Sequence, residues 1–356
     1  MRFIPYSSLV VGLISARDAL GFVTPSHRAT RASSSTVTRH ESTFVKSSPI
    51  PPTTSFAIIS SSTSTSTTTQ LFGWGPDPIW STAFVESNIQ SCPSGSCVSL
   101  KVNVDDGSEF IYPGQYVQVK PAGDDNAKPI FLAMASAPTG IPPKPISPSA
   151  KKTKDADIAA GPEPTTTSPV PGTWEFLIKK TDNNDWITSA SPGSSISISQ
   201  VMGSGFAMRE NLEGFKYDFP TQNILLFATG SGIAPIRSAI ESNQLNIAKM
   251  NSGGRTCTLY YGVRTPDDMP YVSKFPEWEA MGVQVVPVVS QPDMPCASGT
   301  VWNGRTGYVQ NALEEDGVAI PRNSGALLCG VNGMCDSVKS LLLESGVFEG
   351  RILKNF

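Results

Sequence analysis

The residues with the clearest potential for chemistry form a glycine-rich turn that follows a short apolar segment. The segment Ile224–Ala228 is continuously apolar, as in a strand of a parallel sheet that is covered on both faces. The turn has the pattern G-x-G-x-x-P and contains Gly230, Ser231, Gly232, Ile233 and Pro235. Glycines let the backbone approach a pyrophosphate, and a helix that begins near Pro235 would offer its free N–H groups to the phosphates. This pattern predicts a dinucleotide site.

Other catalytic chemistries are limited by the composition. The two histidines, His27 and His40, both lie in a basic, Ser/Thr-rich front segment. If that segment is removed, histidine-dependent nucleophiles, general bases and metal sites are excluded. The formal net charge of -3 argues against nucleic-acid binding. Redox chemistry would therefore come from a bound cofactor, with carboxylates, thiols or backbone groups as the protein's contribution.

The cysteines show no metal-binding spacing. None of the six forms a C-x-x-C pair, so we expect no zinc or iron–sulfur site. Cys92 and Cys97 flank a Pro-Ser-Gly-Ser turn. Two readings stay open for this pair, a disulfide or two free thiols, and we favour the free thiols.

The elements in the first half of the body read as short strands. Polar and apolar residues alternate, or short apolar runs occur, between Gly/Pro turns, which predicts an antiparallel barrel or sandwich. Our fold assignment for this half is an antiparallel, Greek-key β-barrel. The expected strands are Val98–Val104, Tyr116–Lys120, Ile130–Ser136, Trp174–Lys180 and Ser195–Val201. We assign residues 73–218 to this domain and read residues 139–172, which are rich in proline, as a flexible insertion.

From Asn223 onward, strands alternate with helices. This order predicts an α/β domain with a doubly wound parallel sheet, which we assign to residues 219–356. The expected strands are Ile224–Ala228, Thr256–Val263, Val283–Ser290 and Ala326–Cys329. The expected helices begin near Pro235, with Ile236, Ile240 and Ile247 on one face, and cover Tyr271–Met281, Thr306–Glu315 and Met334–Ser345.

The front of the chain reads as a targeting address. Residues 1–21 resemble a signal peptide, and residues 22–72, rich in Ser, Thr and Arg, resemble a transit peptide. Together they resemble the two-part plastid address of algae with secondary plastids, which predicts the chloroplast stroma. The alternative is a secreted protein with a disordered Ser/Thr stalk. Because no run of about 18 apolar residues occurs, we expect no membrane span.

Several motifs together resemble the ferredoxin–NADP reductase-like superfamily. They are Thr229–Pro235, Leu259–Arg264, Leu328–Met334, Phe110–Tyr116 and Gln200–Phe206, in the order and approximate spacing of that superfamily. Further phrases resemble plastid reductase-like proteins of plants and algae whose electron acceptor is unassigned. The resemblance implies a flavin-binding barrel, a pyridine-nucleotide domain, and hydride transfer between NAD(P)H and FAD. An external electron acceptor, possibly a protein, is then required as a partner.

The resemblance also assigns residue roles. It implies that Cys329 lies near the nicotinamide and that Phe356 covers the flavin; the alternatives are a small buried residue and a packed chain end. It implies that Arg264 reads a 2′-phosphate, which favours NADPH over NADH, although Asp267 and Asp268 follow closely. The remaining candidates for cofactor binding are Gly230, Ser231, Gly232, Ile233, Pro235, Gly330 and Met334 for the dinucleotide, and Ala135, Ser136, Gly203 and Ser204 for the flavin.

The chain departs from this superfamily at the flavin signature Arg-x-Tyr-Ser. On that alignment the three positions are Ile130, Leu132 and Ala133, so a charged group and an aromatic stack are missing. Trp186 or Phe206 is a candidate replacement for the stack. The departure keeps a second function open, a flavin-free NAD(P)H-binding redox sensor or assembly protein.

Overall fold

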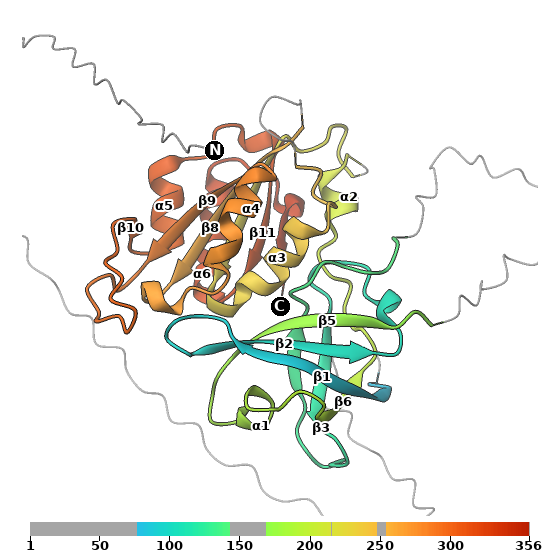
Figure 1. Cartoon of the computed structure of the whole chain (residues 1–356). Helices are drawn as coiled ribbons and strands as arrows, with labels where there is room; N and C mark the ends of the chain where they lie inside the picture. Colours follow the sequence, from blue (N-terminus) through green and yellow to red (C-terminus); the bar gives the residue numbers. More distant parts are fainter. Residues whose placement is uncertain (1–76, 143–168, 215, 248–253, 356) are drawn as a thin grey trace, which may run out of the picture. The chain divides into compact units, whose positions relative to one another are not determined.

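The structure is a computed structural model that describes residues 77–142, 169–214, 216–247 and 254–355. Within these residues two six-stranded sheets form the framework, one antiparallel and one parallel (Figure 1). The predicted targeting address, most of the predicted insertion and Phe356 lie outside the described residues. The fold class predicted from the sequence, a barrel followed by an α/β domain, is confirmed.

The antiparallel sheet has the strand order β4-β3-β6-β1-β2-β5. Its strands are β1 (Trp80–Gln90), β2 (Cys97–Val104), β3 (Tyr116–Pro121), β4 (Ile130–Ala133), β5 (Gly172–Lys179) and β6 (Ser195–Ser199). Three short helices accompany them: η1 (Gly107–Glu109), α1 (Asp185–Thr188) and α2 (Met208–Leu212). Beyond the end of β4, Met134 bridges to Phe176 of β5, so the two edge strands meet and the sheet is nearly closed.

Strand β1 was not predicted, and the structure shows why. Most of its side chains are exposed or half-buried, and only Ala83 and Val85 point fully into the barrel core. Its hairpin with β2 turns through Pro93, where Gly95 N–H donates to the Cys92 carbonyl over 3.0 Å. Gly95 has φ +70°, the left-handed conformation that such a turn requires.

The parallel sheet has the strand order β10-β9-β8-β7-β11-β12. Its strands are β7 (Asn223–Thr229), β8 (Thr256–Val263), β9 (Val283–Val289), β10 (Arg305–Thr306), β11 (Ser324–Cys329) and β12 (Ile352–Lys354). The helical elements are η2 (Gly230–Gly232), α3 (Ile233–Glu241), η3 (Pro266–Asp268), η4 (Val272–Lys274), α4 (Phe275–Ala280), α5 (Val309–Asp316), η5 (Pro321–Asn323), α6 (Asn332–Glu344) and η6 (Glu349–Arg351). The strand order reverses between β7 and β11, which makes this pair the topological switch point.

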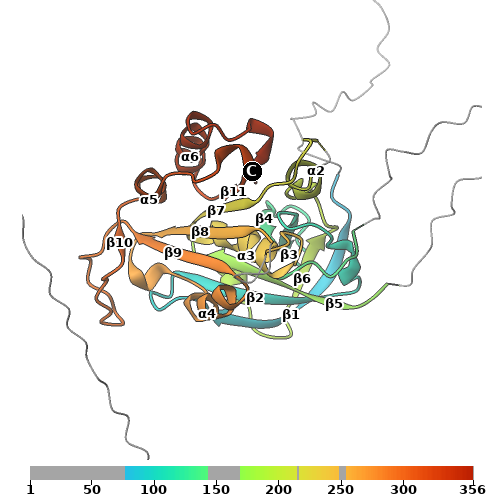
Figure 2. The same ribbon diagram turned by 90° about the horizontal axis from the view of Figure 1, so that it is seen from above.

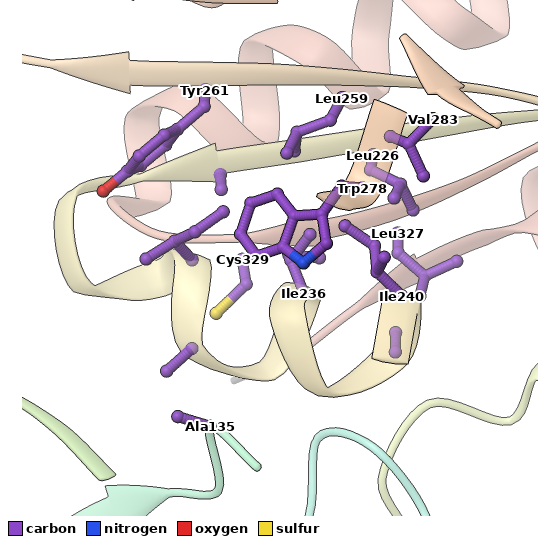
Figure 3. Packing of buried hydrophobic residues seen from close by; sticks show 14 of the residues in the cluster. Ala135, Leu226, Ile236, Ile240, Leu259, Tyr261, Trp278, Val283, Leu327 and Cys329 are labelled. Atoms are coloured by element: carbon purple, nitrogen blue, oxygen red, sulfur yellow. The ribbon is translucent and has the colours of Figure 1, made fainter. Parts of the chain in front are cut away.

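The helices cover both faces of the parallel sheet. Helices α3 and α4 lie on one face and α5 and α6 on the other (Figure 2). On the α3 face, Trp278 of α4 packs among strand residues such as Leu226 and Leu259, and it is fully buried (Figure 3). Alternate strand residues, Leu225 and Phe227 among them, pack against α5 and α6. The sheet therefore separates two apolar cores, as the doubly wound prediction requires.

Several predicted elements change extent in the structure. The expected helix Tyr271–Met281 is shorter: Tyr271 has φ +63°, a 3-10 turn follows, and α4 begins at Phe275. The expectation for Ile247 was wrong, because α3 ends at Glu241 and Ile247 forms a β-bridge with Arg255. The short edge strands β10 and β12 were not predicted, since two or three residues show no periodicity.

Candidate functional site

The carboxyl ends of the parallel strands border two adjoining cavities. The first, here called the sheet-edge cavity, has a volume of about 470 Å³ and is bordered by Gly230, Val263, Arg264, Ser290 and Tyr308, among other residues. The second, here called the switch-point cavity, has a volume of about 490 Å³ and is bordered by Ala133, Gly232, Pro235, Cys329 and Asn355, among others. The two cavities adjoin, because both are lined by Thr229, Gly230, Ser231, Val331 and Lys179.

The two glycines of the turn after β7 have different roles. Gly230 has φ +53°, and a Cβ atom built on it would have no heavy atom within 4 Å. Its open side therefore faces the cavities. Gly232 faces the opposite way: a Cβ on it would contact the carbonyl oxygen of Cys329 and lie 2.7 Å from that carbonyl carbon. Gly232 lets the turn pack against the end of β11, and Gly230 leaves space for a ligand.

The end of β11 is equally constrained. Gly330 has φ +144°, and a Cβ on it would collide with the Thr229 hydroxyl. That hydroxyl accepts a hydrogen bond of 3.0 Å from the Val331 N–H, which links the ends of β7 and β11. The link fixes the width of the switch point, where ligands bind in open parallel sheets.

Cys329 is buried at the wall of the switch-point cavity, and its side chain faces the first turn of α3 (Figure 3). Burial raises the pKa of its thiol to about 12, and the neighbouring Cys335 adds to the shift while Asn355 opposes it. The thiol is therefore neutral near pH 7. Cys329 can shape the cavity and contact a bound ring, but it is not a thiolate nucleophile.

Arg264 lies in the wall of the sheet-edge cavity. Its Nε donates to Gln291 Oε1 over 2.7 Å, which holds the guanidinium beside Ser290 at the end of β9. Asp267 and Asp268, the two carboxylates that follow in the sequence, accept hydrogen bonds from other residues. Asp267 accepts hydrogen bonds from the Ser298 backbone and hydroxyl. The Arg264 guanidinium therefore lies, with hydroxyl groups in the same cavity wall, at the position where the ribose of an adenosine would bind.

Asp268 also borders the sheet-edge cavity, and its charge is held by hydroxyls. It accepts from Ser96 over 3.0 Å and from Thr265 over 2.9 Å. Burial opposes its ionisation, but these hydrogen bonds outweigh burial and lower its pKa. Because its lone pairs are occupied in this way, Asp268 competes less for a ribose hydroxyl than its sequence position suggested.

A basic group of this site comes from the barrel and was missed in the sequence. Lys179 ends β5, is exposed, and lines both cavities. Its backbone pairs with Cys97 of β2. An ammonium at the junction of the two cavities suits an anionic diphosphate that spans them. No local motif surrounds Lys179, and only the position of the strand's end beside the β7 turn shows its role.

The pattern of β4 corrects the expected placement of its aromatic group. Leu132 points into the barrel core and is only 7% exposed, whereas Phe131 is 58% exposed and borders the switch-point cavity. Phe131 lies 5.7 Å from the Tyr116 ring, centroid to centroid. Of the replacements proposed from the sequence, Phe206 is buried and Trp186 packs on the barrel core. The aromatic side chain that borders this cavity is therefore Phe131, with the Tyr116 ring beside it, and the alternation of β4 could have indicated Phe131.

A third cavity, here called the barrel-loop cavity, has a volume of about 680 Å³. The predicted residues Gly203 and Ser204 line it, together with Arg209 of α2. Gly203 has φ +78°, and a Cβ on it would lie 2.9 Å from the Tyr116 ring. The Tyr116 ring therefore links Gly203, which lines this cavity, with Phe131, which lines the switch-point cavity.

The remaining predicted site residues are buried or point elsewhere. Ala135 packs in the core shared with α3 (Figure 3), and Ser136 accepts a hydrogen bond from the Glu175 N–H. The Ile233 side chain is buried in the same core, so only its backbone faces the turn. Met334 is buried but reaches the sheet-edge cavity. Phe356 lies outside the described residues.

A buried ion pair fixes the helix that follows the glycine-rich turn to the barrel. Arg237 of α3 donates to both carboxylate oxygens of Glu175 on β5, over 2.6 and 3.0 Å. Arg237 Nε also donates to Glu241 over 3.0 Å, and its guanidinium stacks on Tyr271. Both partners of the pair are largely buried. The pair holds the cavity walls from β4, β5 and α3 in a fixed arrangement.

The described residues contain neither a metal-binding cluster nor a membrane-spanning helix. No group of three or more His, Cys, Asp or Glu side chains suited to a metal ion occurs within the described ranges. In the same part of the chain, no helix has the length and apolar character needed to cross a membrane.

Comparison with known proteins identifies relatives with this geometry. The family model "Oxidoreductase NAD-binding domain" matches residues 226–340. Fruit protein pKIWI502 of Actinidia deliciosa is 30% identical over 288 residues, which cover 79% of this chain and 76% of that protein.

Two solved structures share the fold at low sequence identity. The ferredoxin NADP+ reductase of Neisseria gonorrhoeae with bound FAD and NADP has a TM-score of 0.54 and 14% identity, and the match covers 78% of this chain and 99% of that one. The cytochrome b5 reductase domain of Ulva prolifera nitrate reductase has a TM-score of 0.52 and 13% identity, with 78% and 98% covered.

Proposed function

Since the chain belongs to the ferredoxin–NADP reductase-like superfamily, a family of NAD(P)H-binding oxidoreductases, we propose that it transfers a hydride between NADPH and a bound FAD and passes the electrons to an external acceptor. The observation that carries the proposal is that the sheet-edge and switch-point cavities adjoin at the glycine-rich turn, which lines both. A dinucleotide held at that turn, with its adenosine at Arg264, would reach the switch-point cavity with its nicotinamide.

The residues around the switch-point cavity fit a flavin. Phe131 and Tyr116 offer an aromatic surface, and the small side chain of Ala133 leaves the β4 backbone accessible. The buried amide nitrogen of Asn355 has no geometric hydrogen-bond partner among the described residues, and Asn355 lines the same cavity. Arg209 and Ser204 border the adjoining barrel-loop cavity and would supply positive charge and a hydroxyl for the flavin's diphosphate. FAD bound there would supply the redox chemistry, namely hydride transfer with the nicotinamide and electron transfer to the acceptor.

The protein's own groups position the reactants. Lys179 and the Gly230–Gly232 backbone bind the diphosphate of the nucleotide, while Cys329, Pro235 and Gly330 form the floor beside the nicotinamide. The Arg237–Glu175 pair fixes the barrel wall relative to that floor. Such positioning lowers the barrier mainly through proximity and orientation.

The neutral state of Cys329 gives a pH prediction. We expect Cys329→Ala to slow NADPH oxidation but to leave the shape of the pH–rate profile unchanged between pH 6 and 9, because the pKa of this thiol is raised to about 12 by burial. Steady-state rates across that range, compared with Cys335→Ala, test this. If the variant loses an ionisation step from the profile, Cys329 acts as a thiolate and the positioning role is wrong.

Arg264 should determine the choice between the two nucleotides. We expect Arg264→Ala to raise the Kd of NADPH by about tenfold, since a charge-assisted bond to phosphate contributes about 1.5 kcal/mol. The Kd of NADH should change little. Titration of both nucleotides gives the comparison, and Arg322→Ala, an exposed arginine on η5, is the matched control. An equal loss for NADPH and NADH would contradict 2′-phosphate recognition.

Lys179 should contribute to both nucleotides. We expect Lys179→Gln to raise the Kd of NADPH and of NADH alike, by about tenfold, because the diphosphate is common to them. Lys180→Gln is the control, as Lys180 is the exposed neighbour and borders neither cavity. The same change in both variants would indicate a general charge effect rather than a contact.

The absorbance spectrum of the purified protein tests the proposed function directly. We expect flavin bands that bleach when NADPH is added without oxygen. A colourless protein that binds NADPH, even after incubation with FAD, would instead support the second function, a flavin-free redox sensor or assembly protein. The absence of arginine and tyrosine at Ile130 and Leu132 is the feature that favours this second function.

The place of action is also a proposal. The basic, Ser/Thr-rich composition of residues 1–72 supports delivery to the plastid stroma. A fluorescent protein fused behind these residues should accumulate in the plastid of an alga with secondary plastids, and secretion of the fusion would contradict the proposal.

A further inference from the structure

Two thiols meet at the tip of the β1–β2 hairpin. The Ser91 N–H donates to the Cys97 carbonyl over 2.9 Å, and the turn through Pro93 returns the chain so that the Ser96 hydroxyl lies 3.4 Å from the Cys92 sulfur and 3.9 Å from the Cys97 sulfur. Both residues are buried, at 4% and 5% exposure, and both cysteines are free. The structure therefore has the free thiols that the sequence favoured, and one hydroxyl group, that of Ser96, lies within hydrogen-bond distance of both sulfurs.

The two sulfurs differ in character. The hydrogen bond from Cys97 lowers the pKa of Cys92, and hydroxyl groups of Ser94 and Ser96, at 3.3 and 3.4 Å from the Cys92 sulfur, contribute in the same direction. The pKa of Cys97 is raised by the same hydrogen bond and by burial. Cys92 is thus suited to attack as a thiolate, and Cys97 retains a proton and can resolve the product.

The hairpin tip belongs to the wall of the sheet-edge cavity. Cys97 and Ser96 line that cavity, opposite Gly230 and Ser231. The tip is fixed to the segment after Arg264, because the Ser94 N–H donates to the Asp267 carbonyl over 3.0 Å. A molecule that fills the cavity therefore covers Cys97 and Ser96, the two residues of the tip that border it.

We propose that Cys92 and Cys97 are a modification site for a small hydroperoxide, which converts them to a disulfide, and that a nucleotide bound in the sheet-edge cavity shields them from this reaction. Hydrogen peroxide is chosen because sulfurs this buried are reached through the cavity only by a small oxidant. The shielding rests on the proposed nucleotide binding, whereas disulfide formation does not.

The reaction balances with peroxide as the only oxidant. The Cys92 thiolate sulfur attacks one oxygen of hydrogen peroxide, the O–O bond breaks, hydroxide leaves, and Cys92 becomes a sulfenic acid. The Cys97 sulfur then attacks the Cys92 sulfur, the S–O bond breaks, and water leaves with the Cys97 proton. The two cysteines lose two electrons in total, and after hydroxide takes up a proton the peroxide has become two waters.

Peptide mass spectrometry of the peroxide-treated wild-type protein is the first test. We expect a peptide linked through Cys92 and Cys97, with two hydrogens lost, that a dithiol reverses. Cys92→Ser and Cys97→Ala should each abolish this product, while Cys296→Ser, which removes a half-exposed thiol in another loop, should leave it unchanged. Oxidation that links other cysteines, or that stops at sulfinic acid on Cys92, would overturn the proposal without any variant needing to fold.

The shielding is tested with NADP+, which peroxide does not oxidise. At a concentration of about ten times its Kd, we expect NADP+ to slow disulfide formation about tenfold, since only the free fraction reacts. The Kd is measured separately by titration. If NADP+ binds and the rate does not change, the shielding is wrong; if NADP+ does not bind, the nucleotide function fails, and the peroxide reaction alone decides the modification site.

Discussion

Gly232→Val is expected to abolish nucleotide binding and to lower the free energy of unfolding by about 3 kcal/mol or more, as overpacking against backbone does. From the sequence alone, Gly232 was expected to let the backbone approach a pyrophosphate, so a side chain there would occupy the phosphate site. The structure corrects that reason, because a Cβ on Gly232 would lie 2.7 Å from the Cys329 carbonyl carbon and 2.8 Å from Gly330 Cα. Neither atom can move aside, since β11 is paired with β7 and β12.

Gly230→Val is the matched comparison. The Cβ of this variant would contact nothing within 4 Å, so we expect only the modest cost of a left-handed residue, about 1–2 kcal/mol. The added side chain would stand in the cavity and block the diphosphate. Chemical denaturation and NADPH titration of both variants separate the two effects. A Gly232→Val protein with wild-type stability would refute the packing role of this glycine.

Arg237→Met is expected to lower the free energy of unfolding by about 3–5 kcal/mol, because it leaves the Glu175 carboxylate buried without its partner. The double variant Arg237→Met/Glu175→Gln should recover part of the loss, since no unpaired charge remains. Lys339→Ala, which breaks the exposed pair with Glu349, is the control and should cost less than about 1 kcal/mol. Denaturation midpoints of the three variants give the comparison, and equal losses would contradict the argument from burial.

The same ion pair has a defined pH dependence. Burial opposes ionisation of Glu175, but the Arg237 hydrogen bonds and charge outweigh it, so the pKa of Glu175 is lowered in the folded state. Because the pKa of Glu175 is lower in the folded than in the unfolded protein, its ionised carboxylate stabilises the fold at pH values above the unfolded pKa, about 4.3 for glutamate. This stabilisation is lost as the pH falls through the folded pKa. The stability difference between wild type and Glu175→Gln should therefore shrink in acid.

The sequence predicted the parts of the fold whose signals are local. Buried strands such as β7 and β8 are long apolar runs, and the glycine-rich turn is defined by its own residues. Strand β1 was missed because a strand with few inward apolar side chains lacks a clear alternation. Helix α3 was extended too far because Asn243 and Asn246, with φ +59° and +49°, end the helix without a glycine or proline.

The candidate site was predictable mainly on the α/β side, with Gly203 and Ser204 as the barrel residues that were also predicted. Gly230, Arg264 and Cys329 all follow or end predicted parallel strands, and such strand ends must meet at one edge of the sheet. Lys179 and Phe131 come from the barrel, and their approach to that edge depends on how the barrel packs on α3. Phe131 was missed because the alignment placed the aromatic position at Leu132, whereas the pleat of β4 points Leu132 inward.

Glu175 joins two structural tasks in one residue. Its backbone carbonyl accepts the Ala135 N–H over 2.7 Å where the barrel closes, and its carboxylate holds Arg237 of the neighbouring α/β fold. Separation of β5 from the segment that follows β4 therefore also releases α3. Loosening of α3 in turn exposes the junction between β5 and that segment. The two halves of the described body should melt together as a single calorimetric transition, even though each has its own apolar core.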